Sequence, residues 1–134
     1  MWRKLKYAIQ RARKGYDDSD TWDFDSWFCR IAPKILRELA YYSDGYPDEY
    51  GSLEKWQQEI YELATRIEEL GKDWVWERNE WTKEYMEALE KKSKDKGIAY
   101  ERWHSRMVEL AEEQNKEVKD VFKKLGEVFY KLWN

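Results

Sequence analysis

Residues 53–74, LEKWQQEIYELATRIEELGKDW, have the clearest helical pattern in the chain. Their large apolar side chains recur at spacings of three and four, which places them on one helix face: they are Trp56, Ile60, Leu63, Ile67, Leu70 and Trp74. Ser52 is a favourable N-cap for this helix. Trp81 and Ala88 continue the spacing in phase, which favours one helix running to about residue 95. A break at Gly71, with Asp73 as the N-cap of a new helix, is the alternative.

The C-terminal part of the chain predicts a partner for this helix. Residues 98–133 carry a second series at spacings of three and four: Trp103, Met107, Leu110, Gln114, Val118, Val121, Leu125, Val128 and Leu132. The polar, lysine-rich segment 91–97 separates the two series, with Gly97 expected to act as a helix breaker. Residues 53–95 and 98–133 are therefore predicted to pack as a long antiparallel pair.

The N-terminal part predicts two shorter helices. Residues 1–14 form a basic helix with Trp2, Leu5, Ile9 and Ala12 on one face, and Gly15 can supply its left-handed stop. An acidic, aromatic turn over residues 16–25 follows. The second helix runs from there to about residue 43, capped by Asp23 or Asp25. Pro33 lies inside it and should bend it. Its expected apolar face consists of Phe24, Phe28, Ile31, Ile35, Leu39 and Tyr42.

These patterns predict an all-α fold in a single helical domain, residues 1–134. It is a helical bundle with a short N-terminal basic helix, a Pro-kinked second helix and a long antiparallel helical pair. No alternation typical of β-strands stands out. Charged residues make up 40% of the chain and nine Trp and ten Tyr supply the core, a composition typical of helices with solvated outer faces.

Charge and cysteine content limit the setting and the partners. The net charge of −3 and the pI of about 5.4 argue against a general nucleic-acid binder. The single cysteine, Cys29, excludes an internal disulfide and agrees with a reducing compartment. No stretch has the length and apolarity of a signal peptide or a membrane span. We expect a cytoplasmic protein that does not engage a membrane.

The residues that enzymes and metal sites need are sparse. His104 is the only histidine, so the chain lacks the ligands of an ordinary zinc site, and no residue stands out as its partner in a Ser-His-Asp or Cys-His arrangement. The acidic run 17–25 does not place Gly and Glu where a calcium-binding EF-hand loop requires them. No glycine-rich phosphate loop is present. We therefore expect no catalytic residues, no metal and no cofactor.

Two features favour binding instead. The N-terminal helix carries six Lys and Arg residues and no acid; it could contact phosphate, an acidic protein or a membrane surface, although neutralising the acidic turn beside it is the simpler expectation. Nineteen Trp and Tyr residues also exceed what the core needs. Those outside the helical series are candidates for partner binding or for stacking on a nucleobase: Trp22, Tyr41, Tyr46, Tyr50 and Trp76.

Several segments carry a resemblance. They are RKGYDDSDTWDFD at residues 13–25, Gly45-Tyr46-Pro47, Trp56 at the start of a helix, and the ending FYKLWN at residues 129–134. Together they resemble a group of small, uncharacterised bacteriophage and prophage proteins. Pro33 and the final Asn134 depart from that pattern, and residues 71–97 have no counterpart in it. The resemblance implies a phage or prophage context and expression in the cytoplasm of a host bacterium, and it supplies no catalytic residues.

The expected function is therefore a non-enzymatic, phage-encoded binding protein. We expect it to inhibit a host protein, with defence proteins such as CRISPR nucleases as natural targets. One alternative is a protein that sequesters a nucleotide or another small molecule, with Trp and Arg contacting base and phosphate. Another is a structural or replication-accessory protein of the phage, in which the aromatic surface forms a homo-oligomer. Nucleic acid is not expected as a direct partner.

Overall fold

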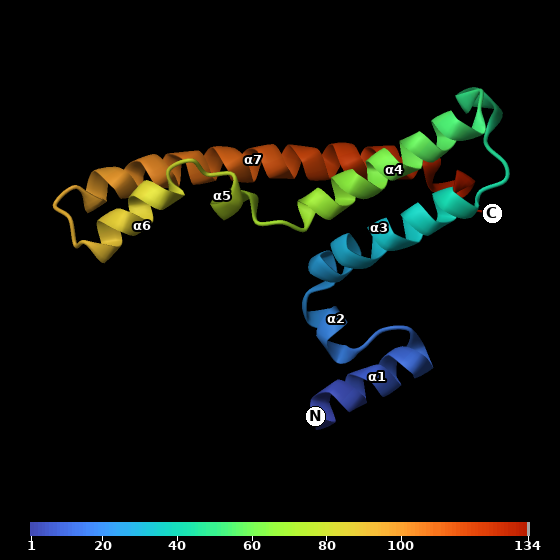
Figure 1. The fold of residues 1–134 in the computed structure, drawn as a ribbon, viewed down its shortest axis with the longest axis horizontal. Helices are drawn as coiled ribbons and strands as arrows, with labels where there is room; N and C mark the ends of the chain where they lie inside the picture. Colours follow the sequence, from blue (N-terminus) through green and yellow to red (C-terminus); the bar gives the residue numbers. More distant parts are fainter. Residues whose placement is uncertain (134) are drawn as a thin grey trace.

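Residues 1–133 are described by the computed structural model, and they form α-helices and two short 3-10 helices, with no β-strand in this range (Figure 1). The helices are α1 (Trp2–Lys14), α2 (Asp18–Trp22), α3 (Phe24–Tyr42), α4 (Leu53–Leu70), α5 (Trp74–Glu77), α6 (Thr82–Glu90) and α7 (Lys96–Val128), and the 3-10 helices are η1 (Asp48–Tyr50) and η2 (Phe129–Lys131). The predicted all-α class is confirmed.

The 33-residue helix α7 is the spine of the molecule. Helices α4, α5 and α6 lie along it in the opposite direction, and α3 lies beside α4 at the end of the molecule where the chain terminates (Figure 1). This confirms the predicted antiparallel pairing. Residues Lys91–Asp95 form the turn between α6 and α7. Lys92, and not Gly97, adopts a positive φ there, of 48°. Gly97 lies in the first turn of α7, so the prediction that it breaks the helix was wrong.

The main core lies where α3, α4 and α7 meet. Its buried members are Leu36 and Ala40 of α3, Trp56, Ile60, Leu63, Ala64 and Ile67 of α4, and Val121 and Val128 of α7. The apolar series predicted for residues 56–74 and 103–132 is buried or half-buried throughout. These two series were therefore correct, because large apolar side chains at helical spacing mark the face that leaves water.

The predicted apolar face of α3 was partly wrong. Phe24, Ile35 and Tyr42 are exposed, whereas Leu36 and Ala40 are buried. Pro33 is also buried, inside a helix that continues through it. Small residues let two helices approach closely, and α3 uses them against α4. Phe28 and Leu39 of the predicted face do pack against the core, so the prediction misplaced part of the face and missed the small residue Ala40.

The helix after residue 53 is broken twice, so the alternative of a break at Gly71 with Asp73 as the next N-cap is confirmed, and a single helix to about residue 95 was wrong. Helix α4 ends at Leu70, and the Asp73 side chain accepts a hydrogen bond from the Trp76 backbone N–H, 3.2 Å away, to cap α5. A second break follows α5 and was not predicted. There the buried Asn79 side chain donates to the Trp103 carbonyl oxygen of α7 (3.0 Å) and accepts from the Trp81 N–H (3.0 Å).

Gly71 permits close packing of α4 on α3. A Cβ at this position would lie 2.8 Å from the Cys29 Cβ, and the backbone φ of −78° is open to any residue. We expect Gly71→Ala to lower the free energy of unfolding by about 1–3 kcal/mol through this clash. Gly126 lies in α7, where an added methyl group would meet nothing within 4 Å, so Gly126→Ala should raise stability by about 0.5–1 kcal/mol. Urea denaturation followed by circular dichroism measures both; shifts of the same sign would contradict the packing argument.

Candidate functional site

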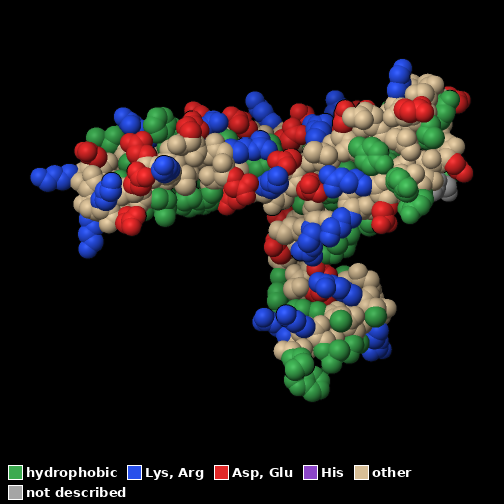
Figure 2. All heavy atoms as spheres, in the orientation of Figure 1, with side chains coloured by type: hydrophobic (Ala, Val, Ile, Leu, Met, Phe, Trp, Pro, Cys, Tyr) green, Lys and Arg blue, Asp and Glu red, His purple; other side chains and the backbone are tan. Residues whose placement is uncertain are grey.

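The N-terminal arm, residues 1–23, stands away from the rest of the molecule (Figure 1). Helix α1 packs on α2, and α2 packs on the start of α3. No residue of α1 is buried. The space-filling view shows the N-terminal arm protruding below the elongated body formed by the other helices. Hydrophobic side chains lie at its far end, with Lys and Arg side chains around it (Figure 2).

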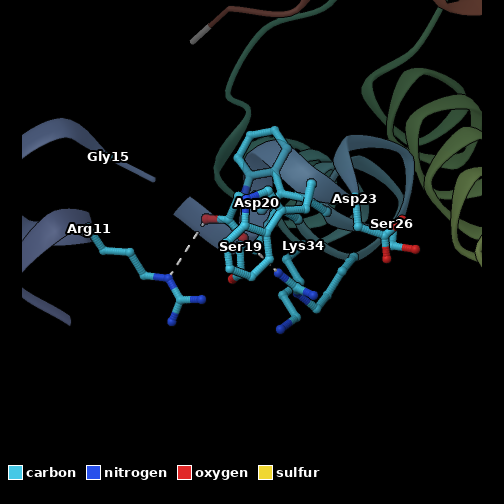
Figure 3. A pocket seen from close by; sticks show the side chains of 11 residues that line it. Arg11, Gly15, Ser19, Asp20, Asp23, Ser26 and Lys34 are labelled. Atoms are coloured by element: carbon cyan, nitrogen blue, oxygen red, sulfur yellow. Dashed lines mark hydrogen bonds and ion pairs between the residues drawn. The ribbon is translucent and has the colours of Figure 1, made fainter. Parts of the chain in front are cut away.

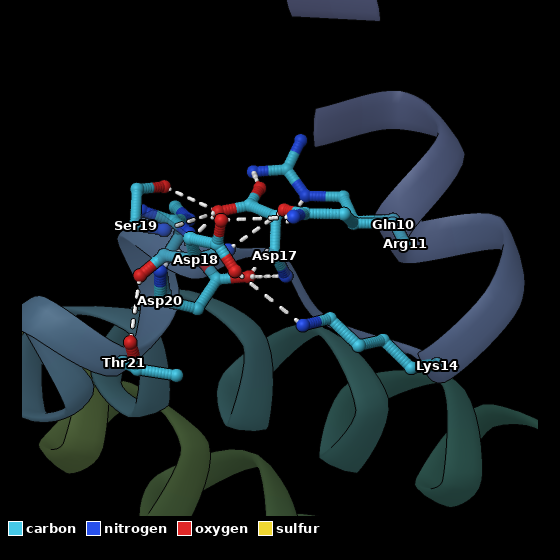
Figure 4. A network of polar contacts seen from close by, with 9 residues as sticks. Gln10, Arg11, Lys14, Asp17, Asp18, Ser19, Asp20 and Thr21 are labelled. Carbon is cyan, nitrogen blue, oxygen red and sulfur yellow. Dashed lines mark hydrogen bonds and ion pairs between the residues drawn. The ribbon is translucent and has the colours of Figure 1, made fainter. Parts of the chain in front are cut away.

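A buried carboxylate organises the arm. Asp17 has no exposed surface and caps α2: it accepts from the N–H groups of Ser19 (2.8 Å) and Asp20 (3.3 Å), while Asp20 accepts from the Asp17 N–H (2.9 Å) (Figure 4). This reciprocal capping box satisfies first-turn N–H groups that would otherwise lack partners. The second oxygen of Asp17 is in an ion pair with the Arg11 guanidinium, whose Nη2 lies 2.5 Å away.

Helix α1 is held to α2 by its polar side. Gln10 donates to the Asp18 carboxylate and accepts from the Asp18 N–H, both at 2.9 Å. Lys6 and Lys14 form ion pairs with the same carboxylate at 3.1 and 3.4 Å (Figure 4 shows Gln10 and Lys14 reaching it). Together with Arg11, these contacts confirm the expectation that the basic helix neutralises the acidic turn.

The apolar side of α1 consequently faces solvent. Trp2, Leu5 and Ile9, here called the α1 stripe, are 86%, 52% and 48% exposed. An amphipathic helix on a globular protein normally turns its apolar stripe toward the core, and α1 is oriented the other way. Its remaining cations, Arg3, Lys4 and Arg13, have no carboxylate partner in the described part of the chain.

Acid should release α1 from α2. Hydrogen bonds and ion pairs from Gln10, Lys6 and Lys14 lower the pKa of Asp18 to about 2, and the Ser19 hydroxyl and Arg11 lower the pKa of Asp17 despite its burial. Because both values lie below the ordinary value of about 3.9, these carboxylates stabilise the arm above pH 4, and the stabilisation disappears as the pH falls toward 2. Amide exchange by NMR should show loss of protection in α1 and α2 over this range, before α4 and α7; simultaneous loss everywhere would contradict it.

An open cleft of about 690 Å³ lies where the arm meets α3 (Figure 3). Arg11 borders it from α1, Trp22 from α2, and Arg30 and Lys34 from α3. The 6%-exposed Asp20 lies at its centre; its carboxylate is 3.4 Å from the Arg30 Nη2 and 3.9 Å from the Arg11 Nε. The cleft thus combines cationic side chains from two helices with an indole ring.

The aromatic residues selected from the sequence do not form one site. Trp22, 75% exposed, belongs to the arm and its cleft. Tyr41 is 69% exposed, and its ring packs on the neighbouring Tyr42. Trp76 is 42% exposed and packs on Trp103 with 5.0 Å between ring centres. Both lie in the part of the molecule where α5 and α6 pack on α7, here called the distal half.

The other two selected residues lie at the bundle end. Tyr46, 44% exposed, lines a hollow with Pro47 and Lys131. Tyr50 is half-buried against Trp56, with ring centres 4.7 Å apart. The N-terminal helix that carries the α1 stripe was expected as a possible contact surface through its cations, whereas Arg30 and Lys34 were not selected from the sequence. The spacing of Trp2, Leu5 and Ile9 was visible, but nothing in it tells whether a helix face is covered.

Groups with chemical reactivity are not gathered in the described chain. Burial raises the pKa of the Cys29 thiol, which keeps it protonated, and His104 lies against the Tyr100 ring. Residues 1–133 contain no group of three His, Cys, Asp or Glu side chains placed to hold a metal ion. Within the same residues, none of the helices has the length and apolarity required to cross a membrane.

Comparison with known proteins gives no match to a protein-family profile, a curated protein or a solved structure.

Proposed function

We propose that this chain is a non-enzymatic, phage-encoded binding protein that inhibits a host defence protein, and that it docks through the α1 stripe. The observation that supports docking is the orientation of α1. Its polar side is tied to α2 by Gln10, Arg11 and Lys14, and its apolar side points into solvent. The phage context rests on the resemblance of residues 13–25 described above.

The geometry of the stripe indicates the kind of partner. Trp2, Leu5 and Ile9 follow the i, i+3, i+7 spacing of helices that insert into an apolar groove, and Trp is among the residues that dominate binding energy. Arg3 lies beside the stripe together with Lys6, and the cations Lys4 and Arg13 belong to the same helix. The complementary surface is therefore an apolar groove with carboxylates on its rim. Because α2 already holds α1 in place, little ordering entropy is lost on binding.

Replacing Leu5 and Ile9 together with Glu tests this proposal. The matched control is Met86→Glu with Leu89→Glu on α6, since these side chains are similarly exposed, at 48% and 43%. Bacteria carrying individual defence systems would express each variant and be challenged with a phage. We expect the wild-type chain and the control to restore plaque formation against one system, and the stripe variant to fail. With the purified target, the stripe variant should bind more than about 100-fold more weakly.

Two outcomes would overturn parts of the proposal. If no defence system is inhibited, the inhibitor function is wrong. If the stripe variant inhibits as well as the control, α1 is not the docking surface. Vesicles with anionic lipids and sedimentation of the free chain provide the remaining tests: stripe-dependent binding to vesicles, or a stripe-dependent dimer, would replace the host protein as the occupant of this surface.

A further inference from the structure

The cleft between α1, α2 and α3 brings the cationic side chains of Arg11, Arg30 and Lys34 beside the carboxylates of Asp20 and Asp23. Asp20 is shared between Arg11 and Arg30 through contacts of 3.9 and 3.4 Å, and both guanidinium side chains stay more than half exposed, at 55% and 53%. Arg11 also forms an ion pair with the buried Asp17, 2.5 Å away, so Lys34, one helical turn after Arg30, is the cation of the cleft that forms no ion pair within residues 1–133. The cations converge on one place from two helices and retain N–H donors for an anion.

The same cleft has an aromatic wall that the fold does not need. Trp22 is 75% exposed and makes no ring contact with another described residue. Trp27 and Ile31, both half-buried, supply an apolar lining beside it. An exposed indole next to a half-buried apolar surface is a stacking platform for a planar ring, and such stacking tolerates any base.

From these two observations we propose that the cleft binds a small molecule that joins a planar aromatic ring to an anionic group, such as a nucleoside monophosphate. Its volume of about 690 Å³ lies within the roughly 300–1,000 Å³ range of small-molecule pockets. The ring stacks on Trp22. The anionic group contacts the guanidinium forks and Lys34, because a guanidinium pairs with phosphate oxygens in a bidentate manner.

The position of Asp23 sets the direction of the ligand. Figure 3 places Asp23 and Ser26 at one end of the cleft and Arg11 at the other, with the Arg11 side chain extended toward Asp20. The Asp23 carboxylate, which contacts the Asp25 side chain, disfavours an anion beside it, so the phosphate lies at the Arg11 end. A ligand carrying two separate anionic groups, one at each end, is disfavoured.

This site is independent of the proposed docking surface. None of the three residues of the α1 stripe lines the cleft, and the cleft uses the polar side of α1 instead. Ligand binding can therefore be measured on the purified full chain without any protein partner. A failure of nucleotide binding leaves the inhibitor proposal in place, and the reverse also holds.

Calorimetric titration of the full chain with AMP, cyclic AMP, GMP and UMP tests the inference, with adenosine and inorganic phosphate as the two halves of the ligand. We expect nucleotides to bind more tightly than either half. Trp22→Ala should weaken binding by at least about tenfold, whereas Trp133→Ala, equally exposed at 75%, should leave it unchanged. Lys34→Glu should also weaken binding, and the distant Lys94→Glu should not. Both cleft positions are exposed, so circular dichroism of the variants should match the wild type.

Three results would overturn the inference. One is the absence of binding by all four nucleotides at millimolar concentration. Another is equal binding by the Trp22→Ala and Trp133→Ala variants, which would remove the stacking platform. The third is phosphate alone binding as tightly as AMP, since the cleft would then recognise an anion without its ring.

Discussion

Trp56→Ala will lower the free energy of unfolding by about 3–5 kcal/mol, the usual cost of removing a fully buried large aromatic side chain. Trp56 is 1% exposed and lies at the start of α4, inside the core formed by α3, α4 and α7. The Tyr50 ring packs on it with 4.7 Å between ring centres. Removing the indole leaves a cavity between α3, α4 and α7. The helices cannot move inward to fill it, because each is held in place by its other core contacts.

Urea denaturation followed at the far-ultraviolet helix signal measures this loss. Trp133→Ala serves as the control because it removes the same side chain from a position that is 75% exposed, and we expect it to change stability by less than about 0.5 kcal/mol. A loss below about 1 kcal/mol for Trp56→Ala would mean that the packing around this residue is looser than the structure shows.

Trp103→Ala will melt the distal half of the molecule while the bundle remains folded. Trp103 is the centre of a second, aromatic core: its ring lies 5.0 Å from Trp76 and 5.2 Å from Tyr85, and its indole N–H donates to the Thr82 hydroxyl at 3.2 Å. Helices α5 and α6 have four and nine residues, too short to be stable alone. They depend on this contact with α7.

Hydrogen exchange resolved by segment distinguishes local from global loss. In the Trp103→Ala variant, amides of residues 74–90 should exchange at rates close to those of an unfolded chain, and those of α4 should keep their wild-type protection. Met86→Ala, at a 48% exposed position on the same helix α6, is the control and should leave both segments protected. Uniform destabilisation of α4 and α6 would show that the two cores unfold as one unit.

The sequence predicted those parts of the fold that depend on large apolar side chains. Both series along α4 and α7 were correct, because burial of such residues at helical spacing determines which faces pack. The break at Gly71 was only one of two alternatives that the sequence left open, and the break at Asn79 was not predicted. A segment that must contact α7 repeatedly keeps the same apolar phase whether its helix is continuous or interrupted, so Trp74 and Trp81 carry no information on continuity.

The candidate site was predictable only in part. Trp22 was selected because it falls outside the helical series, and the pairing of basic α1 with the acidic turn followed from charge. The exposure of Leu5 and Ile9 could not be predicted, since amphipathic spacing is the same for a covered and an uncovered face. Arg30 and Lys34 could not be assigned to a site from the sequence, because only the three-dimensional arrangement of α1 and α3 places them around the same cleft as Arg11.

The antiparallel course of α7 also has a consequence for the order in which the chain folds. Contacts between the C-terminal helices and the segments before them join residues progressively farther apart in sequence. Asn79 and Trp103 are 24 residues apart, Arg66 and Glu117 are 51, and Glu49 and Lys131 are 82. If pairing begins at the Lys91–Asp95 turn, each new contact closes only a short additional loop. We therefore expect α5 and α6 to pack on the N-terminal half of α7 first. The three-helix core, which needs Val121 and Val128, then closes only after residue 128 has been synthesised.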